Sequence, residues 1–121
     1  MFYHEGKMYQ CAGFQDSKTR NKHFKKHVKG VPANSVGAGD LAHLNITDAY
    51  AYQQMACTFM NQAGRFHATD FPIVTLETSK GNIARWNQNS GLFGSMTPDG
   101  TLLTFHIRKD ASQFQTAITD N

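Results

Sequence analysis

The sequence has no long apolar run and few cysteines. A helix that crosses a bilayer needs about 20 apolar residues, and no stretch of the chain provides them, so we expect no membrane-spanning segment. The N-terminal residues MFYHEGKMYQC also lack the apolar stretch of a signal peptide. Only Cys11 and Cys57 can pair, which allows at most one disulfide. Because Cys57 lies inside an apolar helical pattern, we expect a buried free thiol, and nothing demands an oxidising compartment.

Linkers, internal repeats and low-complexity segments are also missing. The chain has 121 residues, of which 40% are hydrophobic and 17% are charged. These proportions are typical of a globular protein rather than a disordered one. The length is sufficient for one modest core but not for two. The sequence therefore predicts a single domain over residues 1–121.

Acidic residues are absent from residues 18–29. This segment holds six of the twelve basic residues, although the net charge of the chain is only +3. The six are Lys18, Arg20, Lys22, Lys25, Lys26 and Lys29. A helix of this composition attracts polyanions, of which nucleic acid is the commonest. The alternative is a solubilising surface, but most solvated helices mix both signs of charge.

The same segment contains the motif HFKKHV. In a helix, His23 and His27 are about one turn apart and share a face, which Lys26 flanks. Phe24 and Val28 point roughly a quarter-turn away and can pack against a core. Histidine changes charge near neutral pH, so a pair beside lysines can transfer protons. The alternative interpretation is a solvated helix face with incidental histidines.

The basic segment is expected to be the first of two helices, which together occupy about residues 15–64. Asp16 or Ser17 can cap its N-terminus, and Gly30 is a natural residue to follow its C-terminus. Residues 31–45 contain one proline and two glycines and are typical of a loop.

A second helix is expected after this loop. Thr47 is the expected N-cap, Asp48 favours the positive end of the helix dipole, and Gly64 ends the helix. Apolar residues recur with helical spacing and form a buried stripe. The stripe consists of Tyr52, Met55, Ala56, Phe59 and Met60. We assign it to the core and give this helix no chemistry.

From residue 72 onward the pattern changes to short β-prone runs. These are PIVTLET, NIARWN, LFGSM and TLLTFHIR, separated by the turn sequences SKG, QNSG and TPDG. Such short connections predict a four-stranded antiparallel meander over about residues 72–108. Two helices followed by four strands give an α+β fold with both helices on one sheet face. The other face would then be open, and the polar tail after Lys109 should fray.

The last predicted strand carries polar side chains on one face. Its core face is assigned to Leu103, Phe105 and Ile107. Its opposite face then carries Leu102, Thr104, His106 and Arg108. Arg85 and Asn87, from NIARWN, are expected on the same concave surface. Threonine, histidine and arginine together suit a phosphate site, whereas Trp86 is expected to anchor the core.

Several motifs follow one another in a particular order. A basic helix with H-x-x-K-H precedes an amphipathic helix, then a meander with N-x-x-[ST]-G-x-F-G, P-D-G and a strand that begins T-x-aromatic. This order resembles the barnase–EndoU–colicin–RelE class of ribonuclease domains, which includes toxic C-terminal domains of contact-dependent growth inhibition proteins and other bacterial polymorphic toxins. The matching residues, within about residues 14–108, are His23, Lys26, His27, Asn87, Ser90, Gly91, Phe93, Gly94, Pro98, Asp99, Gly100 and Thr104. The chain departs from the class at His106, where an aromatic residue is more usual.

The resemblance implies that RNA is cut without a metal or another cofactor. A base removes the ribose 2′-hydroxyl proton, the 2′-oxygen attacks the neighbouring phosphate, and an acid protonates the departing 5′-oxygen. DNA lacks the 2′-hydroxyl, so this mechanism selects RNA. The expected catalytic residues are His23, Lys26, His27, Thr104 and His106. The expected substrate-binding residues are Lys18, Lys22, Lys25, Arg85, Asn87 and Arg108.

The resemblance also implies a biological setting. The expected substrate is tRNA in a target bacterium, and a cognate immunity protein would protect the producing cell. The domain would be exported as part of a larger effector and act in the target-cell cytoplasm. A host translation factor is a further partner that the resemblance allows, although no residue indicates it.

Two other functions remain open from the residues alone. His23 and His27 have the i, i+4 spacing of a zinc pair, with His106 or Asp40 as a third ligand. Against a zinc-dependent nuclease, lysines crowd this position and the helix offers no Glu as general base. The other alternative is a non-catalytic RNA-binding module, which would use the basic helix but would not need histidines.

Overall fold

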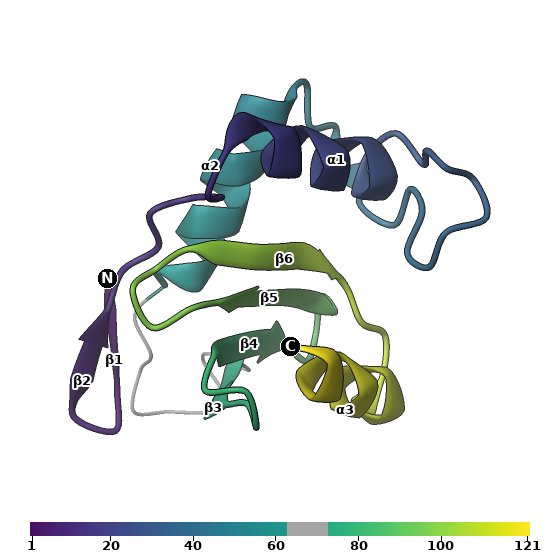
Figure 1. Cartoon of the computed structure of the whole chain (residues 1–121). Helices are drawn as coiled ribbons and strands as arrows, with labels where there is room; N and C mark the ends of the chain where they lie inside the picture. Colours follow the sequence, from purple (N-terminus) through teal and green to yellow (C-terminus); the bar gives the residue numbers. More distant parts are fainter. Residues whose placement is uncertain (63–72) are drawn as a thin grey trace.

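The computed structural model describes residues 1–62 and 73–121 and has an α+β fold (Figure 1). Its helices are α1 (Ser17–His27), α2 (Ala49–Met60), α3 (Ala111–Asp120) and the 3-10 turn η1 (Ala42–Leu44). The main sheet has four antiparallel strands, β3 (Ile73–Glu77), β4 (Ile83–Asn87), β5 (Leu92–Met96) and β6 (Leu102–Ile107). A second, two-stranded sheet pairs β1 (Phe2–His4) with β2 (Lys7–Tyr9). In the described part of the chain, no helix combines the length and the apolar character needed to cross a membrane.

The predicted four-stranded meander is confirmed. The strands follow one another in the order β3-β4-β5-β6, so β3 and β6 form the two edges. The turn between β4 and β5 depends on Asn87, whose side-chain oxygen accepts hydrogen bonds from the backbone N–H groups of Asn89 and Ser90. A register shift between Ser95 and Met96 interrupts the pairing of β5 with β6.

The N-terminal caps of the first two helices are both aspartates. Asp16 accepts a hydrogen bond from the backbone N–H of Thr19 at 2.7 Å, which confirms one of the two predicted caps. The expectation that Thr47 caps α2 is wrong. The extended backbone and carboxylate of Asp48 perform this function, with a 2.7 Å hydrogen bond from Ala51. The residue expected to end this helix, Gly64, lies outside the described residues.

Helices α1 and α2 share one large core with the sheet. Phe24 of α1 is buried, and Val28 packs beside it, as the HFKKHV pattern predicts. The apolar stripe of α2 packs against β5 and β6, and the Tyr52 hydroxyl donates a 2.6 Å hydrogen bond to the Phe105 carbonyl. The predicted core role of this stripe is therefore confirmed. In β6, Phe105 and Ile107 face this core as expected. The assignments of the two leucines are wrong, because beyond the register shift Leu102 is buried in this core and Leu103 is not part of it.

The second face of the sheet is covered by α3, so the expectations of an open face and a frayed tail are wrong. Asp110 caps α3 through a 2.9 Å hydrogen bond from the Gln113 N–H. Phe114 then stacks on Trp86, with ring centroids 4.7 Å apart, and packs with Phe93 in a second apolar cluster. Figure 1 shows α3 on the side of the sheet away from α2. The predicted core role of Trp86 is confirmed.

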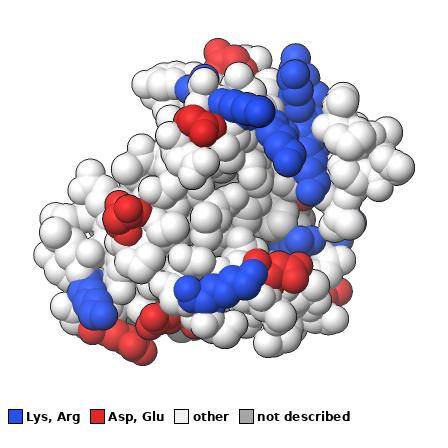
Figure 2. All heavy atoms as spheres, viewed as in Figure 1, with Lys and Arg blue, Asp and Glu red and all other residues white. Residues whose placement is uncertain are grey.

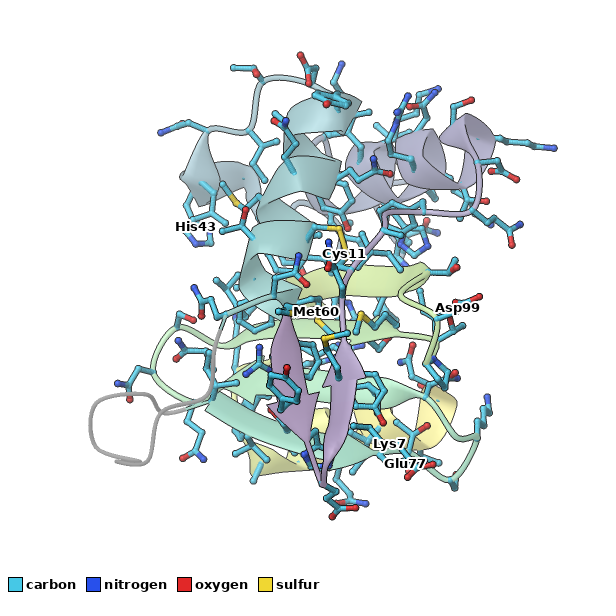
Figure 3. All side chains as sticks on the ribbon, turned by 90° about the vertical axis from the view of Figure 1, so that its left-hand side faces the viewer. Lys7, Cys11, His43, Met60, Glu77 and Asp99 are labelled. Carbon is cyan, nitrogen blue, oxygen red and sulfur yellow. A yellow bond between two sulfur atoms is a disulfide. The ribbon has the colours of Figure 1, made fainter. Side chains whose placement is uncertain are left out.

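The prediction of a free thiol at Cys57 is also wrong. Cys57 forms a disulfide with Cys11, which joins α2 to the segment that follows β2 (Figure 3). The same segment is held by a 2.8 Å hydrogen bond from the Cys11 N–H to the Asn61 side chain. Cys57 is also only half-buried, and the apolar helical pattern around it could not indicate that the N-terminal segment passes beside α2 at this point.

Candidate functional site

A cleft of about 480 Å³ lies between α1, β6 and α3, and we call it the histidine cleft. Helix α1 contributes His23, Lys26 and His27, and β6 contributes Thr104 and His106. The structure thus brings together the five residues expected to be catalytic, although α1 and β6 are far apart in the sequence. The alternative of a solvated helix face is wrong for His27, because only 1% of this residue is exposed.

The positions of the three imidazoles follow from local geometry. His23 and His27 are one helical turn apart and their ring centroids are 5.8 Å apart. His106 pairs laterally with Phe93 of β5 and therefore points to the α3 side of the sheet. Its ring meets His27 edge-on, with a centroid distance of 4.9 Å. The three rings form a continuous row from α1 to β6.

Asp40 fixes the orientation of His27. The Nδ1 atom of His27 is 3.1 Å from the Asp40 carboxylate and 3.1 Å from the Gly37 carbonyl oxygen. Both partners are acceptors, so we assign a proton to Nδ1, which leaves Nε2 as the atom that can accept another proton. Asp40 and Gly37 therefore fix the tautomer and the orientation of the His27 ring.

The same carboxylate connects His27 to the edge of the sheet. Its second oxygen accepts a 3.1 Å hydrogen bond from the backbone N–H of Ile107, on the free edge of β6. Gly37 allows the loop to close over this arrangement. Its φ is +77°, and a Cβ atom there would lie 3.0 Å from Asp40 Oδ2 and 3.2 Å from His27 Cε1. Asp40 thus sets the position of α1 relative to His106.

Burial keeps two of the three histidines neutral. The pKa of His23 is lowered to about 4 by desolvation, and by the nearby charges of His27 and Lys26. The pKa of His106 is lowered much further, first by desolvation and then by the charge of Arg108. The Nδ1 atom of His23 and the Nε2 atom of His106 are buried without a hydrogen-bond partner among the described residues. These atoms are free to interact with a ligand in the cleft.

The basic side chains of α1 extend outward from the cleft. Figure 2 shows Lys and Arg side chains concentrated over α1, whereas both signs are mixed over the lower part of the same view. Lys18, Lys22 and Lys25 line a separate shallow hollow on α1. Of the expected substrate-binding residues, only Arg108 lines the histidine cleft itself. The three lysines can therefore attract a polyanion but do not reach the imidazoles.

Two expected substrate-binding residues are not part of this surface. Arg85 pairs laterally with Gly94, so it points to the α2 side of the sheet and not toward His106. It is 2% exposed and donates hydrogen bonds to the Thr75 hydroxyl and to the carbonyl oxygens of Met60 and Gln62. Arg85 thus binds the free carbonyls after the last turn of α2.

Asn87 also has a structural role. Its side chain is used in the turn between β4 and β5, as described above. The expectation that Arg85 and Asn87 share a surface with Thr104 and His106 is therefore wrong. The physical reason is the lateral register of the sheet, which pairs Trp86, and not Arg85, with the strand position that leads to His106.

Three side chains of the cleft could hold a metal ion. One ligand atom from each of His27, Asp40 and His106 lies within 4.8 Å of the others. Two imidazoles and one carboxylate are a common donor set for zinc and other transition metals. Lys26 and Arg108 line the same cleft and oppose a cation, whereas Asp120, also in its lining, offsets part of this charge.

Two parts of the site were missed or misassigned from the sequence. Asp40 was considered only as a metal ligand, because its pairing with His27 depends on how the glycine-rich loop folds back. The wall formed by α3 was not expected at all. The signal for it was present in an aspartate cap followed by apolar residues with helical spacing, Phe114, Ala117 and Ile118.

Comparison of the chain with protein-family models, with curated proteins and with solved structures finds no match. The resemblance to the barnase–EndoU–colicin–RelE class therefore depends on the sequence motifs alone, and functional inference has to start from the geometry of the cleft.

Proposed function

We propose that the protein is a metal-independent endoribonuclease whose active site is the histidine cleft. The observation that carries the proposal is the row of three imidazoles, one of them oriented by Asp40, at the end of a helix rich in lysine. Proton transfer requires titratable groups within reach of one another, and binding of a polyanion requires nearby positive charge. The cleft and its rim supply both.

The neighbouring histidines suit opposite roles in the reaction. Neutral His23, whose low pKa keeps it unprotonated, accepts the proton of the ribose 2′-hydroxyl. The 2′-oxygen attacks the phosphorus and the bond from phosphorus to the 5′-oxygen breaks. His27, which Asp40 orients, donates its Nε2 proton to the departing oxygen. Different environments of adjacent titratable groups are a recurrent basis for assigning base and acid.

The remaining residues of the cleft stabilise charge on the phosphate. Lys26 and Arg108 supply positive charge, and the Thr104 hydroxyl supplies a hydrogen-bond donor. His106 packs edge-on against His27 and keeps its ring in place. The products would be a 2′,3′-cyclic phosphate and a free 5′-hydroxyl.

The biological setting is proposed from the sequence resemblance. The domain would cut tRNA in the cytoplasm of a competing bacterium, reach it as part of a larger effector, and be neutralised by an immunity protein. A host translation factor could assist it. The basic face of α1 is consistent with a polyanionic substrate but does not distinguish tRNA from other RNA.

The test is incubation of the purified protein with total RNA in excess chelator. We expect fragments that end in a cyclic phosphate, and no cleavage of DNA of the same sequence. His27→Asn keeps a donor for Asp40 but removes the transferable proton, so it should abolish cleavage. His4→Asn, at the histidine that ends β1 and lies outside the cleft, is the matched control. RNA that is retained but never cut would instead support a non-catalytic RNA-binding module.

A zinc-dependent nuclease is the second candidate, and the convergence of His27, Asp40 and His106 favours it. In that case the metal would supply an activated water, and a chelator would remove all activity. Activity lost in chelator and restored by zinc, together with cleavage of DNA, would select this candidate over the first.

A further inference from the structure

A second hollow, of about 700 Å³, adjoins the histidine cleft, and we call it the outer hollow. Val36, Arg108 and Gln113 line both spaces, so a ligand can extend from one to the other past these side chains. The rest of the wall comes from the loop before η1, from His43 of η1, from Ser90 in the turn between β4 and β5, and from Ile107 and Lys109 at the end of β6. No step of the reaction described above uses this hollow.

We propose that the outer hollow binds the base of the nucleotide whose phosphate lies in the histidine cleft, and that it selects bases with a keto oxygen at pyrimidine C4 or purine C6, uracil and guanine. This inference rests on the proposed ribonuclease function. It deepens that function, because it assigns the residues that decide where along an RNA chain the cut is made.

The size and apolar surface of the hollow suit a planar base. Its volume is within the range of roughly 300–1,000 Å³ that is usual for small-molecule sites. Val36 is 72% exposed and lies at the boundary with the histidine cleft. The half-buried Ile107 also lines the hollow. These aliphatic side chains can cover the face of a ring.

Three side chains of the hollow, Arg108, Lys109 and Gln113, offer donors. The side-chain oxygen of Gln113 accepts a 2.8 Å hydrogen bond from the Lys109 N–H, which fixes the amide and leaves its NH₂ group as donor. The Nε atom of Arg108 is buried without a hydrogen-bond partner among the described residues. The ammonium of Lys109 is a further donor. A buried donor without a partner is unfavourable, so an acceptor on a ligand would be bound here.

The charged acceptor of the hollow, Asp40, is already used. Both oxygens of Asp40 accept hydrogen bonds, one from His27 and one from Ile107. A keto oxygen at pyrimidine C4 or purine C6 matches the donors, whereas the amino group that adenine and cytosine carry at that position would face other donors. Arg108 lines both spaces and can contact the phosphate and the base of one nucleotide.

The first experiment measures binding without any cleavage. The isotope-labelled protein would be titrated with the 3′-monophosphates of uridine, guanosine, adenosine and cytidine, and with inorganic phosphate, while backbone amide signals are followed by NMR. We expect the uridine and guanosine nucleotides to shift the signals of Val36, Ile107 and Lys109 and to bind about tenfold more tightly than the other two. Inorganic phosphate should leave the signal of Lys109, which lines only the outer hollow, unchanged.

The second experiment changes the donor. Gln113→Glu keeps the oxygen that accepts from the Lys109 N–H but replaces the NH₂ group with an acceptor. It should reduce the preference for uridine and guanosine nucleotides by about tenfold, and it should spread RNA cleavage over all four bases. Gln115→Glu adds the same charge to the same helix at an exposed position outside both spaces. It should change neither the nucleotide preference nor the bases at which RNA is cleaved.

The outcomes separate this inference from the ribonuclease proposal. Equal binding of all four nucleotides, or an unchanged base preference in Gln113→Glu, would overturn the base-selection site even if RNA is cut. Selective binding of uridine and guanosine nucleotides by a protein that cuts no RNA would support the nucleotide site and overturn the ribonuclease function.

Discussion

Acidification should destabilise the protein because it must protonate buried histidines. His106 is 6% exposed, and desolvation lowers its pKa far below the unfolded value of about 6.5. Between these two values the unfolded chain binds a proton that the folded chain does not. The contribution of neutral His106 to the free energy of unfolding is therefore fully present above pH 6.5. It decreases as the pH falls below this value and stops decreasing only below the pKa of His106 in the folded protein.

The size of the effect follows from this difference. At pH 5, an unfolded histidine is almost fully protonated while His106 in the folded protein is not. Between pH 7 and pH 5 this difference removes about 2 kcal/mol from the free energy of unfolding. His23, whose pKa is lowered to about 4, acts in the same direction but by less, because it is more exposed to solvent. The total free energy of unfolding of a typical domain is only about 5–15 kcal/mol, so this loss is a substantial part of it.

Urea unfolding at pH 7 and pH 5 measures the effect, and His106→Phe isolates the contribution of one residue. Phenylalanine retains an aromatic ring against His27 and Phe93 but cannot be protonated. Between pH 7 and pH 5, the free energy of unfolding of the variant should decrease by about 2 kcal/mol less than that of the unaltered protein. His43→Phe, the same substitution at an exposed histidine, should behave like the unaltered protein. Equal pH dependence of His106→Phe and the unaltered protein would refute the assignment of a buried, neutral His106.

Three other substitutions test separate parts of the structure. Asp40→Asn removes the charge beside His27 and should slow RNA cleavage by about 10²–10⁴-fold while RNA still binds, and a folded variant with the original rate would contradict the proposed role. Arg85→Lys loses the planar guanidinium that donates to the Thr75 hydroxyl and to the carbonyls of Met60 and Gln62. It should lower the free energy of unfolding by about 2–4 kcal/mol, with RNA affinity unchanged at temperatures where the variant is folded. Cys57→Ser removes the disulfide to Cys11, which joins residues 46 positions apart, and should lower the free energy of unfolding by about 2–4 kcal/mol. Equal stability of the reduced and the oxidised protein would argue against this disulfide.

The local signals of the sequence were reliable where short-range physics decides the structure. The HFKKHV motif places two histidines on one helix face and Phe24 and Val28 in the core, because the helical period is set by backbone geometry. The turn sequences set the meander, since such short connections join adjacent antiparallel strands. The proximity of His27, Thr104 and His106, which the sequence suggested, is confirmed by the cleft that they line.

The predictions that were wrong concern contacts between distant segments. A one-residue difference in lateral register moves a side chain to the opposite face of a sheet, so Arg85 caps α2 instead of facing His106. The bond of Cys57 to Cys11 requires the N-terminal segment to pass beside α2. Neither arrangement leaves a periodic pattern in the residues concerned.

The sequence by itself determined the α+β class, the meander and the concentration of lysine and histidine on α1. Only the tertiary structure decided what those residues can do. Burial between α1, β6 and α3 removes water from His23 and His106, and the folding of the loop brings Asp40 to His27. Protonation state and orientation depend on surroundings contributed by every part of the fold, and no segment of the chain encodes those surroundings alone.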